Sequence, residues 1–194
     1  MAATLIRILK DEHQALAAML RSMLLMLSSA RNHGRLPDFA ALRAMIFYVD
    51  EFPEQRHHRK ESELLFPKLR ERSLRVRDVL DRLDAEHEAG HRKIRELEHA
   101  LLAFEMLGEA RRDSFERAAQ AYVDFYLAHM AVEEKEILPL AEQVLTADEL
   151  RELDAAFAAN RDPLTGHPPE PDYAALFSRI VNLVPAPYGL GPER

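Results

Sequence analysis

The sequence predicts an all-α protein, an up-down-up-down four-helix bundle with a short C-terminal helical or extended extension. Apolar residues recur at three- and four-residue spacing through four long stretches, which is the pattern of amphipathic helices. Ala, Leu, Glu and Arg, which favour helix, dominate the composition. Short connections place successive helices antiparallel. In a chain of 194 residues that is 47% hydrophobic, we expect one bundle over residues 1–145 and an extension over residues 146–194 packed on it.

The first half of the chain is expected to form two long helices. Thr4 is suited to cap the first helix, which continues to about Ala30. Gly34 is suited to end it, because glycine readily takes the left-handed conformation found there. Asp38 is suited to cap the second helix, which continues through Leu65.

The second half is expected to add two more long helices. The third begins near residues 74–76 and ends at about Gly108, and the fourth follows from Phe115 through Leu140. Thr146, with a Glu three residues later, has the pattern of a capping box that opens a short fifth helix.

The extension changes in composition after this fifth helix. A Pro-rich stretch over residues 161–171 is expected to be a loop. Residues 173–183 have the apolar spacing of a short amphipathic helix, and residues 185–189 are expected to be extended or turned.

Composition and charge exclude several classes of function. A net charge of −7 argues against a general nucleic-acid binder. The absence of Cys excludes disulfides, thiolate metal sites and thiol catalysis. No apolar run approaches the ~18 residues of a membrane span, and the N-terminus lacks a secretory pattern. We therefore expect a cytoplasmic protein with no membrane or nucleic-acid partner, whose oligomeric state the sequence leaves open.

The strongest signal is an internal repeat. His57-x-x-x-Glu61 and His129-x-x-x-Glu133 lie 72 residues apart, and in each a Pro follows the Glu by six residues. Positions i and i+4 share one face of a helix, so each copy directs an imidazole and a carboxylate to the same region. Because the repeat places the two prolines identically, we expect them to kink the helices near this region rather than only to end them.

A second repeat brings in the other two helices. Glu12-His13 resembles Glu86-His87 at an offset of 74 residues. His91 follows His87 by one turn, so both could reach one ion, with Gly90 leaving space beside them. The corresponding position in the first helix is an Ala, which predicts an asymmetric site with three nitrogens on one ion and two on the other.

These side chains lie on stripes that should face the core, where unpaired carboxylates are costly. Imidazole and carboxylate together suit iron, manganese or zinc, and two bridged cations would turn the repulsion between two carboxylates into attraction. The predicted metal ligands are His13, His57, Glu61, His87, His91, His129 and Glu133.

Two neighbouring residues are alternatives to members of this set. His58 is turned by about 100° from His57, so we expect it outside the ligand shell or at the surface. Glu134 lies five residues after His129, but Glu133 is preferred because it repeats Glu61.

Two further residues are expected beside the ligands. Tyr126 should line the same pocket, either as core packing or as a hydrogen-bond donor to a species bound at the metal. Asp84, three residues before His87, could orient the free N–H group of that histidine.

The ordered set of motifs resembles the hemerythrin-like, or HHE cation-binding, family over roughly residues 5–143. The resemblance implies two iron ions with a bridging oxide or hydroxide. His87, His91 and His129 would bind one iron, His13 and His57 the other, and the two glutamates would bridge them. The iron with two histidines would keep an open position for dioxygen or another small ligand.

The resemblance leaves several functions open. Oxygen-carrying members place the second carboxylate five residues after its His, whereas the better match here is four, so oxygen carriage is less secure than di-iron binding. The same centre could decompose peroxide or oxidise a substrate, and whether turnover occurs is undecided. Glu54-x-x-His57 and Glu88-x-x-His91 also fit a ferritin-like, ferroxidase pattern, and zinc or manganese could replace iron.

Overall fold

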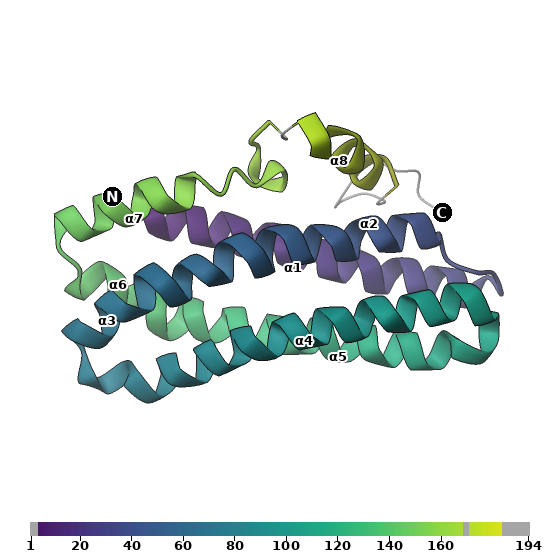
Figure 1. Ribbon diagram of the computed structural model, residues 1–194, viewed down its shortest axis with the longest axis horizontal. Helices are drawn as coiled ribbons and strands as arrows, with labels where there is room; N and C mark the ends of the chain where they lie inside the picture. Colours follow the sequence, from purple (N-terminus) through teal and green to yellow (C-terminus); the bar gives the residue numbers. More distant parts are fainter. Residues whose placement is uncertain (1–3, 169–170, 184–194) are drawn as a thin grey trace.

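The computed structural model describes residues 4–168 and 171–183 (Figure 1). These residues are 91% helical and contain no strand, so the predicted fold class is confirmed. None of the helices in these ranges combines the length and the apolar run that crossing a bilayer requires.

The first two rods of the bundle agree with the predicted helices. Asp38 caps the second rod, where its side chain accepts a hydrogen bond from the backbone N–H of Ala41. This rod runs without a break through two π-helical segments. The elements are α1 Thr4–Asn32, α2 Phe39–Val49, η1 Asp50–His58, η2 Glu61–Leu65 and α3 Phe66–Arg72.

The last two rods agree with the predicted helices except at the start of the fourth. The fourth rod begins at Arg112 rather than at Phe115, directly after a 3-10 turn that starts at Gly108 with a positive φ of 68°. The elements are η3 Leu74–Val76, α4 Arg77–Leu107, η4 Gly108–Arg111, α5 Arg112–Val132, η5 Glu133–Ile137 and α6 Leu138–Val144.

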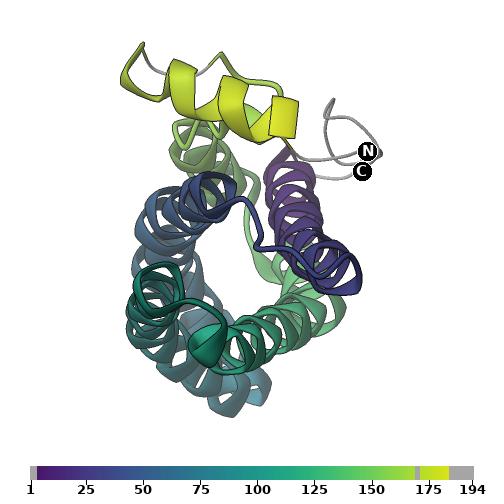
Figure 2. The ribbon, with the colours of Figure 1, turned by 90° about the vertical axis from the view of Figure 1, so that its right-hand side faces the viewer.

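The described part of the extension packs outside the four rods, as Figure 2 shows along the bundle axis. The predicted capping box is present, with Thr146 and Glu149 bonded to each other's backbone N–H groups. Helix α7 packs on α1, and α8 packs on α2. The elements are α7 Ala147–Ala158, η6 Pro163–Thr165 and α8 Pro171–Leu183. The segment predicted over residues 185–189 lies outside the described residues.

The apolar core consists of two clusters along the bundle, and each rod contributes to both. On α1, for example, Leu5 and Leu9 belong to one cluster, and Leu16 and Leu20 belong to the other. The residues between the clusters on each rod are the predicted His and Glu ligands. A buried polar layer therefore crosses the middle of an otherwise apolar core.

Two π-helical segments, η2 and η5, lie at equivalent positions of the internal repeat. In them the N–H of Phe66 bonds to the carbonyl of Glu61, and the N–H of Leu138 bonds to that of Glu133. A proline lies two positions after the last residue of each segment. Proline can neither donate the next backbone hydrogen bond nor fit against a preceding α-helical turn. The prolines thus coincide with wide turns beside the polar layer, and the helix continues past each of them.

Candidate metal centre

Two pairs of buried imidazoles face each other in the polar layer. His13 Nε2 on α1 lies 3.2 Å from His57 Nε2 on η1, and His87 Nε2 on α4 lies 3.0 Å from His129 Nε2 on α5. Two lone pairs directed at each other repel unless a proton or a cation lies between them. Two nitrogens bound to one ion at about 2.1 Å, roughly at right angles, are about 3 Å apart, so the observed spacing suits a shared metal.

The outer nitrogen of one histidine in each pair meets a carboxylate. His57 Nδ1 lies 2.7 Å from Glu12 Oε2, and His129 Nδ1 lies 2.8 Å from Glu86 Oε2. Because a carboxylate can only accept, Nδ1 carries the proton, and the lone pair of Nε2 is free for a metal. The protein therefore selects the metal-binding tautomer of both rings.

His87 is oriented through a chain of hydrogen bonds that includes Asp84. His87 Nδ1 lies 2.9 Å from Ser62 Oγ, and the Ser62 hydroxyl donates to Asp84 Oδ1 at 2.5 Å. Arg70 Nη2 donates to Asp84 Oδ2 at 2.6 Å and holds the carboxylate in place. Asp84 thus acts on His87 through Ser62 and not by the direct contact predicted from the sequence.

Glu61 and Glu133 lie between the two imidazole pairs. Each is fully buried and directs one carboxylate oxygen to each pair. The distances are 3.3 Å from Glu61 Oε1 to His57 Nε2, 3.5 Å from Glu61 Oε2 to His87 Nε2, 3.3 Å from Glu133 Oε2 to His13 Nε2, and 3.2 Å from Glu133 Oε1 to His129 Nε2.

The four oxygens of these two carboxylates are buried and accept no hydrogen bond. An unsatisfied buried carboxylate is strongly destabilising, and two of them at close range repel each other. Cations held between the imidazole pairs would satisfy all four oxygens at once. The residues present therefore fit a pair of metal ions bridged by the two glutamates.

The electrostatics of the layer point the same way. Burial raises the pKa of Glu61, and the Glu133 carboxylate adds to the effect. Burial also opposes ionisation of Glu133, but His129 and His13 outweigh it and lower its pKa well below the usual range. Burial lowers the pKa of His87, whereas the pKa of His129 rises to about 10 because Glu133 outweighs burial. The shifts run in opposite directions within one buried layer, so these side chains interact strongly, and bound cations would supply positive charge to the same two carboxylates.

The third nitrogen near His87 and His129 comes from His58, not from His91. His58 is 2% exposed and stacks on His87 with ring centroids 4.5 Å apart. The side chain of His91 is 36% exposed, and its nearest carboxylate contact is Glu54 at 3.9 Å. The structure differs here from the prediction, because the second rod packs between α1 and α4. Adjacent residues about 100° apart can then face the two neighbours separately.

The space at Gly90 is used by a tyrosine and a glutamate. A Cβ atom at this position would overlap the Tyr126 hydroxyl and lie 2.9 Å from both Glu54 oxygens. Tyr126 and Tyr122 both donate to Glu54 Oε1, and Glu54 Oε2 lies 3.4 Å from His58 Nδ1. The Tyr126 ring stacks on His58 at 5.2 Å. Tyr126 therefore lies against the outer side of a candidate ligand.

Two groups of four buried side chains in the described part of the chain could each hold an ion, with potential ligand atoms within 4.8 Å of one another. One group is His13, His57, Glu61 and Glu133, and the other is His58, Glu61, His87 and His129. We call their imidazole sets the two-histidine half and the three-histidine half.

The sequence profile of the Hemerythrin HHE cation binding domain matches residues 4–141. The chain belongs to this family. Comparisons with curated proteins and with solved structures gave no match. The match spans all four rods and every member of both buried groups, so the two groups fit the di-metal site of an HHE domain.

Glu134 lies at the edge of this HHE site. Its side chain is 42% exposed, and its Oε1 is 3.1 Å from His13 Nδ1. Glu133, by contrast, is fully buried between the two halves. Glu134 is therefore placed to orient His13 rather than to bridge.

Sequence reasoning missed the outer carboxylates of the HHE site, although a signal was present. The repeat of Glu12-His13 as Glu86-His87 predicts two histidine ligands but not a role for the two glutamates. In the structure Glu12 contacts His57, and Glu86 contacts His129. The repeat therefore carries the outer contacts as well as the ligands.

A small cavity of about 10 Å³ adjoins the two-histidine half. Its lining combines His13 and His57 with Leu16, Phe52 and Asn160. This volume is about that of one water molecule, so the space beside this half is narrow, and both polar and apolar side chains line it.

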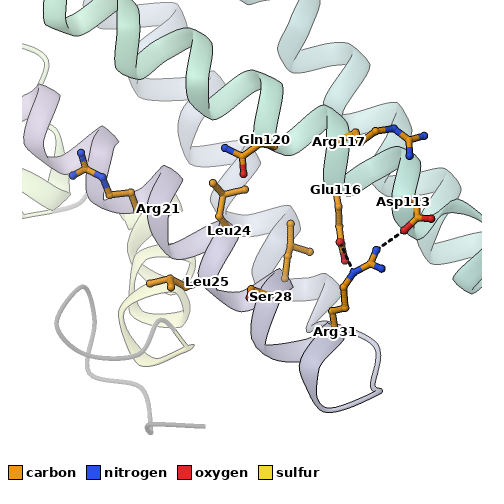
Figure 3. Close-up of a pocket in the computed structure, with 10 residues that line it drawn as sticks. Arg21, Leu24, Leu25, Ser28, Arg31, Asp113, Glu116, Arg117 and Gln120 are labelled. Atoms are coloured by element: carbon orange, nitrogen blue, oxygen red, sulfur yellow. Dashed lines mark hydrogen bonds and ion pairs between the residues drawn. The ribbon is translucent and has the colours of Figure 1, made fainter.

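A larger groove of about 750 Å³ lies on the outside of the domain between α1 and α5 (Figure 3). Arg31 bonds there to Glu116 and Asp113 at 2.8 and 2.5 Å. No residue of either metal-binding group lines this groove.

Proposed function

We propose that the chain is a non-haem di-iron protein that binds or senses dioxygen or a related small molecule. The observation that carries the proposal is the set of four buried, unsatisfied carboxylate oxygens between two pairs of facing imidazoles. The proposed ligands are His13 and His57 for one ion, His58, His87 and His129 for the other, and Glu61 and Glu133 as bridges.

The donor set supports iron without requiring it. Imidazole and carboxylate ligands without sulfur suit iron, and they also suit zinc and manganese. When bound, a carboxylate-bridged pair of irons supplies redox chemistry toward dioxygen, nitric oxide or peroxide. The family match supports a di-metal centre of this kind.

The two halves differ in a way that favours small-ligand binding at one of them. The two-histidine half has one nitrogen fewer, and the cavity adjoins this half. Leu16 and Phe52 line the cavity together with polar side chains. The chain itself thus offers a small space beside the less crowded half.

The structure gives less support to a ferroxidase-like site for iron storage. Glu54 is held by Tyr122 and Tyr126, Glu88 is exposed, and neither residue belongs to a metal-binding group in the described ranges. The ferritin-like spacing in the sequence therefore does not form a ferritin-like cluster of side chains here.

The test is metal analysis combined with optical spectra of the freshly purified protein. We expect about two irons per chain and, when the reduced protein meets air, a spectral change that reverses as oxygen is removed. Repeated decomposition of peroxide that His13→Ala abolishes would instead favour the enzymatic alternative. A single zinc per chain would contradict both redox functions.

A further inference from the structure

A short segment beyond the HHE match reaches the two-histidine half. Residues 160–162, here called the strap, follow α7 and precede η6. Asn160 is 2% exposed, and its side-chain amide donates to both oxygens of Glu12, at 3.0 Å each. Glu12 in turn holds His57 Nδ1 at 2.7 Å. One residue of the extension is thus three contacts away from a proposed metal, through Glu12 and His57.

The orientation of the Asn160 amide is fixed by its other contacts. Lys60 Nζ donates to Asn160 Oδ1 and, at 2.7 Å, to the carbonyl of Ala156. Arg56 Nη1 donates to the Asn160 carbonyl at 3.3 Å. An ammonium group can only donate, so the amide oxygen must face Lys60 and the amide nitrogen must face Glu12.

The strap is anchored a second time through Asp162. The Tyr48 hydroxyl on α2 donates to Asp162 Oδ2 at 2.7 Å, and Asp162 Oδ1 accepts from the N–H of Leu164 at 2.9 Å. Arg161, between the two anchors, has a φ of 48° and is the one non-glycine residue in the described ranges with a positive φ. A conformation of this kind persists only when its surroundings hold it in place.

We propose that Asn160 is a positioning residue of the metal centre. It fixes the plane of the Glu12 carboxylate, and Glu12 in turn fixes the tautomer and orientation of His57. The extension thereby helps to position a ligand of the two-histidine half. The inference rests on the proposed di-metal centre, and it adds that one ion depends on residues beyond the HHE match.

The three-histidine half provides an internal comparison. Glu86 accepts a hydrogen bond from His129 Nδ1, as Glu12 does from His57 Nδ1. The side chain of Glu86 is 27% exposed, however, and its neighbouring cation is Arg82 on the same helix, at 3.7 Å. The strap does not contact this half in the described structure. Loss of Asn160 should therefore weaken one half of the centre selectively.

The experiment measures Co²⁺ binding to the full-length, metal-free chain in two backgrounds. His129→Ala disables the three-histidine half, and His13→Ala disables the two-histidine half. Adding Asn160→Ala should weaken Co²⁺ binding about 10- to 100-fold in the first background, as for the loss of other outer contacts to metal ligands, and less than 2-fold in the second. Equal losses in both backgrounds, or no loss in the first, would overturn the proposal.

A second variant separates positioning from packing. Asn160→Asp keeps the shape of the side chain and its bond from Lys60, but it presents an acceptor to Glu12 instead of a donor. Positioning predicts that Asp weakens the two-histidine half at least as much as Ala does, with the helical circular dichroism unchanged. Wild-type affinity in Asn160→Asp would show that Asn160 only fills space.

The same titration separates this inference from the proposed function. If a half-site background does not fold, the otherwise wild-type chain takes its place, and Asn160→Ala should weaken one of two Co²⁺ steps and leave the other unchanged. Equal weakening of both steps, or of neither, again overturns the role of Asn160. A wild-type chain that binds fewer than two ions would instead refute the di-metal centre.

Discussion

The two halves of the metal centre come from one repeated pattern, yet they differ in four respects. The two-histidine half has a buried outer carboxylate, an adjoining cavity and a clamp from the extension. The three-histidine half has an extra imidazole, from His58, and a partly exposed outer carboxylate. The repeat thus supplies a symmetric frame, and the differences between its copies decide which half is crowded and which has space beside it.

Part of the asymmetry can be traced to two positions of the 72-residue repeat. His58 corresponds to Met130, so one copy alone supplies an extra nitrogen. Glu54 corresponds to Tyr126, and these two residues bond to each other across the bundle, so the repeat becomes complementary at this point. Two differences between the copies, both within one helical turn of the ligands, therefore contribute to the asymmetry, and the extension contributes the clamp.

The largest expected effect is the loss of both halves together. Glu61→Ala removes an oxygen from each half and leaves Glu133 without its symmetric partner, so metal content should fall from about two ions per chain to nearly none. The control is Glu63→Ala, which removes an exposed residue paired with Arg59. Elemental analysis that still finds two ions in Glu61→Ala would mean that Glu61 does not bridge.

The next effect distinguishes the two candidates for the third imidazole. His58→Ala should release the ion of the three-histidine half and retain the other, leaving about one ion per chain. His91→Ala should retain two ions, because its side chain lies outside both groups. The reverse outcome, measured by the same metal analysis, would restore the ligand set predicted from the sequence.

A smaller effect compares the two outer carboxylates. Glu12→Gln and Glu86→Gln should each weaken one Co²⁺ step by about 10- to 100-fold, since each removes the negative partner of an Nδ1–H group. We expect the larger loss for Glu12, because its surroundings are buried and less screened by water. A larger loss for Glu86 would show that burial does not set the strength of this contact.

The smallest expected effect concerns the second anchor of the strap. Burial raises the pKa of Asp162 to about 6, above the ordinary value of about 3.9. The folded chain therefore holds this proton more tightly than the unfolded chain, so the stabilisation from protonation is complete below about pH 4 and is lost as the pH rises through 6. Between pH 5.5 and 7 the loss should be about 1 kcal/mol.

Asp162→Asn provides the test of this titration in the metal-free chain. The variant should not show that part of the pH dependence, because an amide does not titrate in this range. Urea unfolding of both proteins at pH 5.5 and pH 7 measures the difference in slope. Identical slopes would assign the pH dependence to other groups.

Much of the fold and part of the site could be predicted from the sequence, because local rules govern them. The caps at Asp38 and Thr146 and the apolar periodicity depend on residues within a few positions of one another. The i, i+4 spacing likewise brought His57 and Glu61 to one region. These features require no knowledge of which helix lies beside which.

The remaining features depend on that knowledge. The spacing of His87 and His91 satisfies the one-face rule, but it does not show that the neighbouring space is filled by Tyr126 and Glu54. His58 becomes a candidate ligand only because its rod packs between two others. Asn160 contacts Glu12 from 148 residues away, and no local pattern marks that contact.

The wide turns at Glu61–Leu65 and Glu133–Ile137 have a consequence for insertions and deletions. Each turn holds one residue more than an α-helical turn would, which sets the rotation between a bridging carboxylate and the apolar side chains beyond it. Deleting one residue there would let the turn close as ordinary α-helix, and the helix beyond it would keep nearly the same direction, because the wide turn had taken up the extra residue. Phe66 and Leu69 would then still face the core, so these two turns should tolerate the loss of one residue better than the regular parts of the rods, where a deletion rotates everything after it by about 100°.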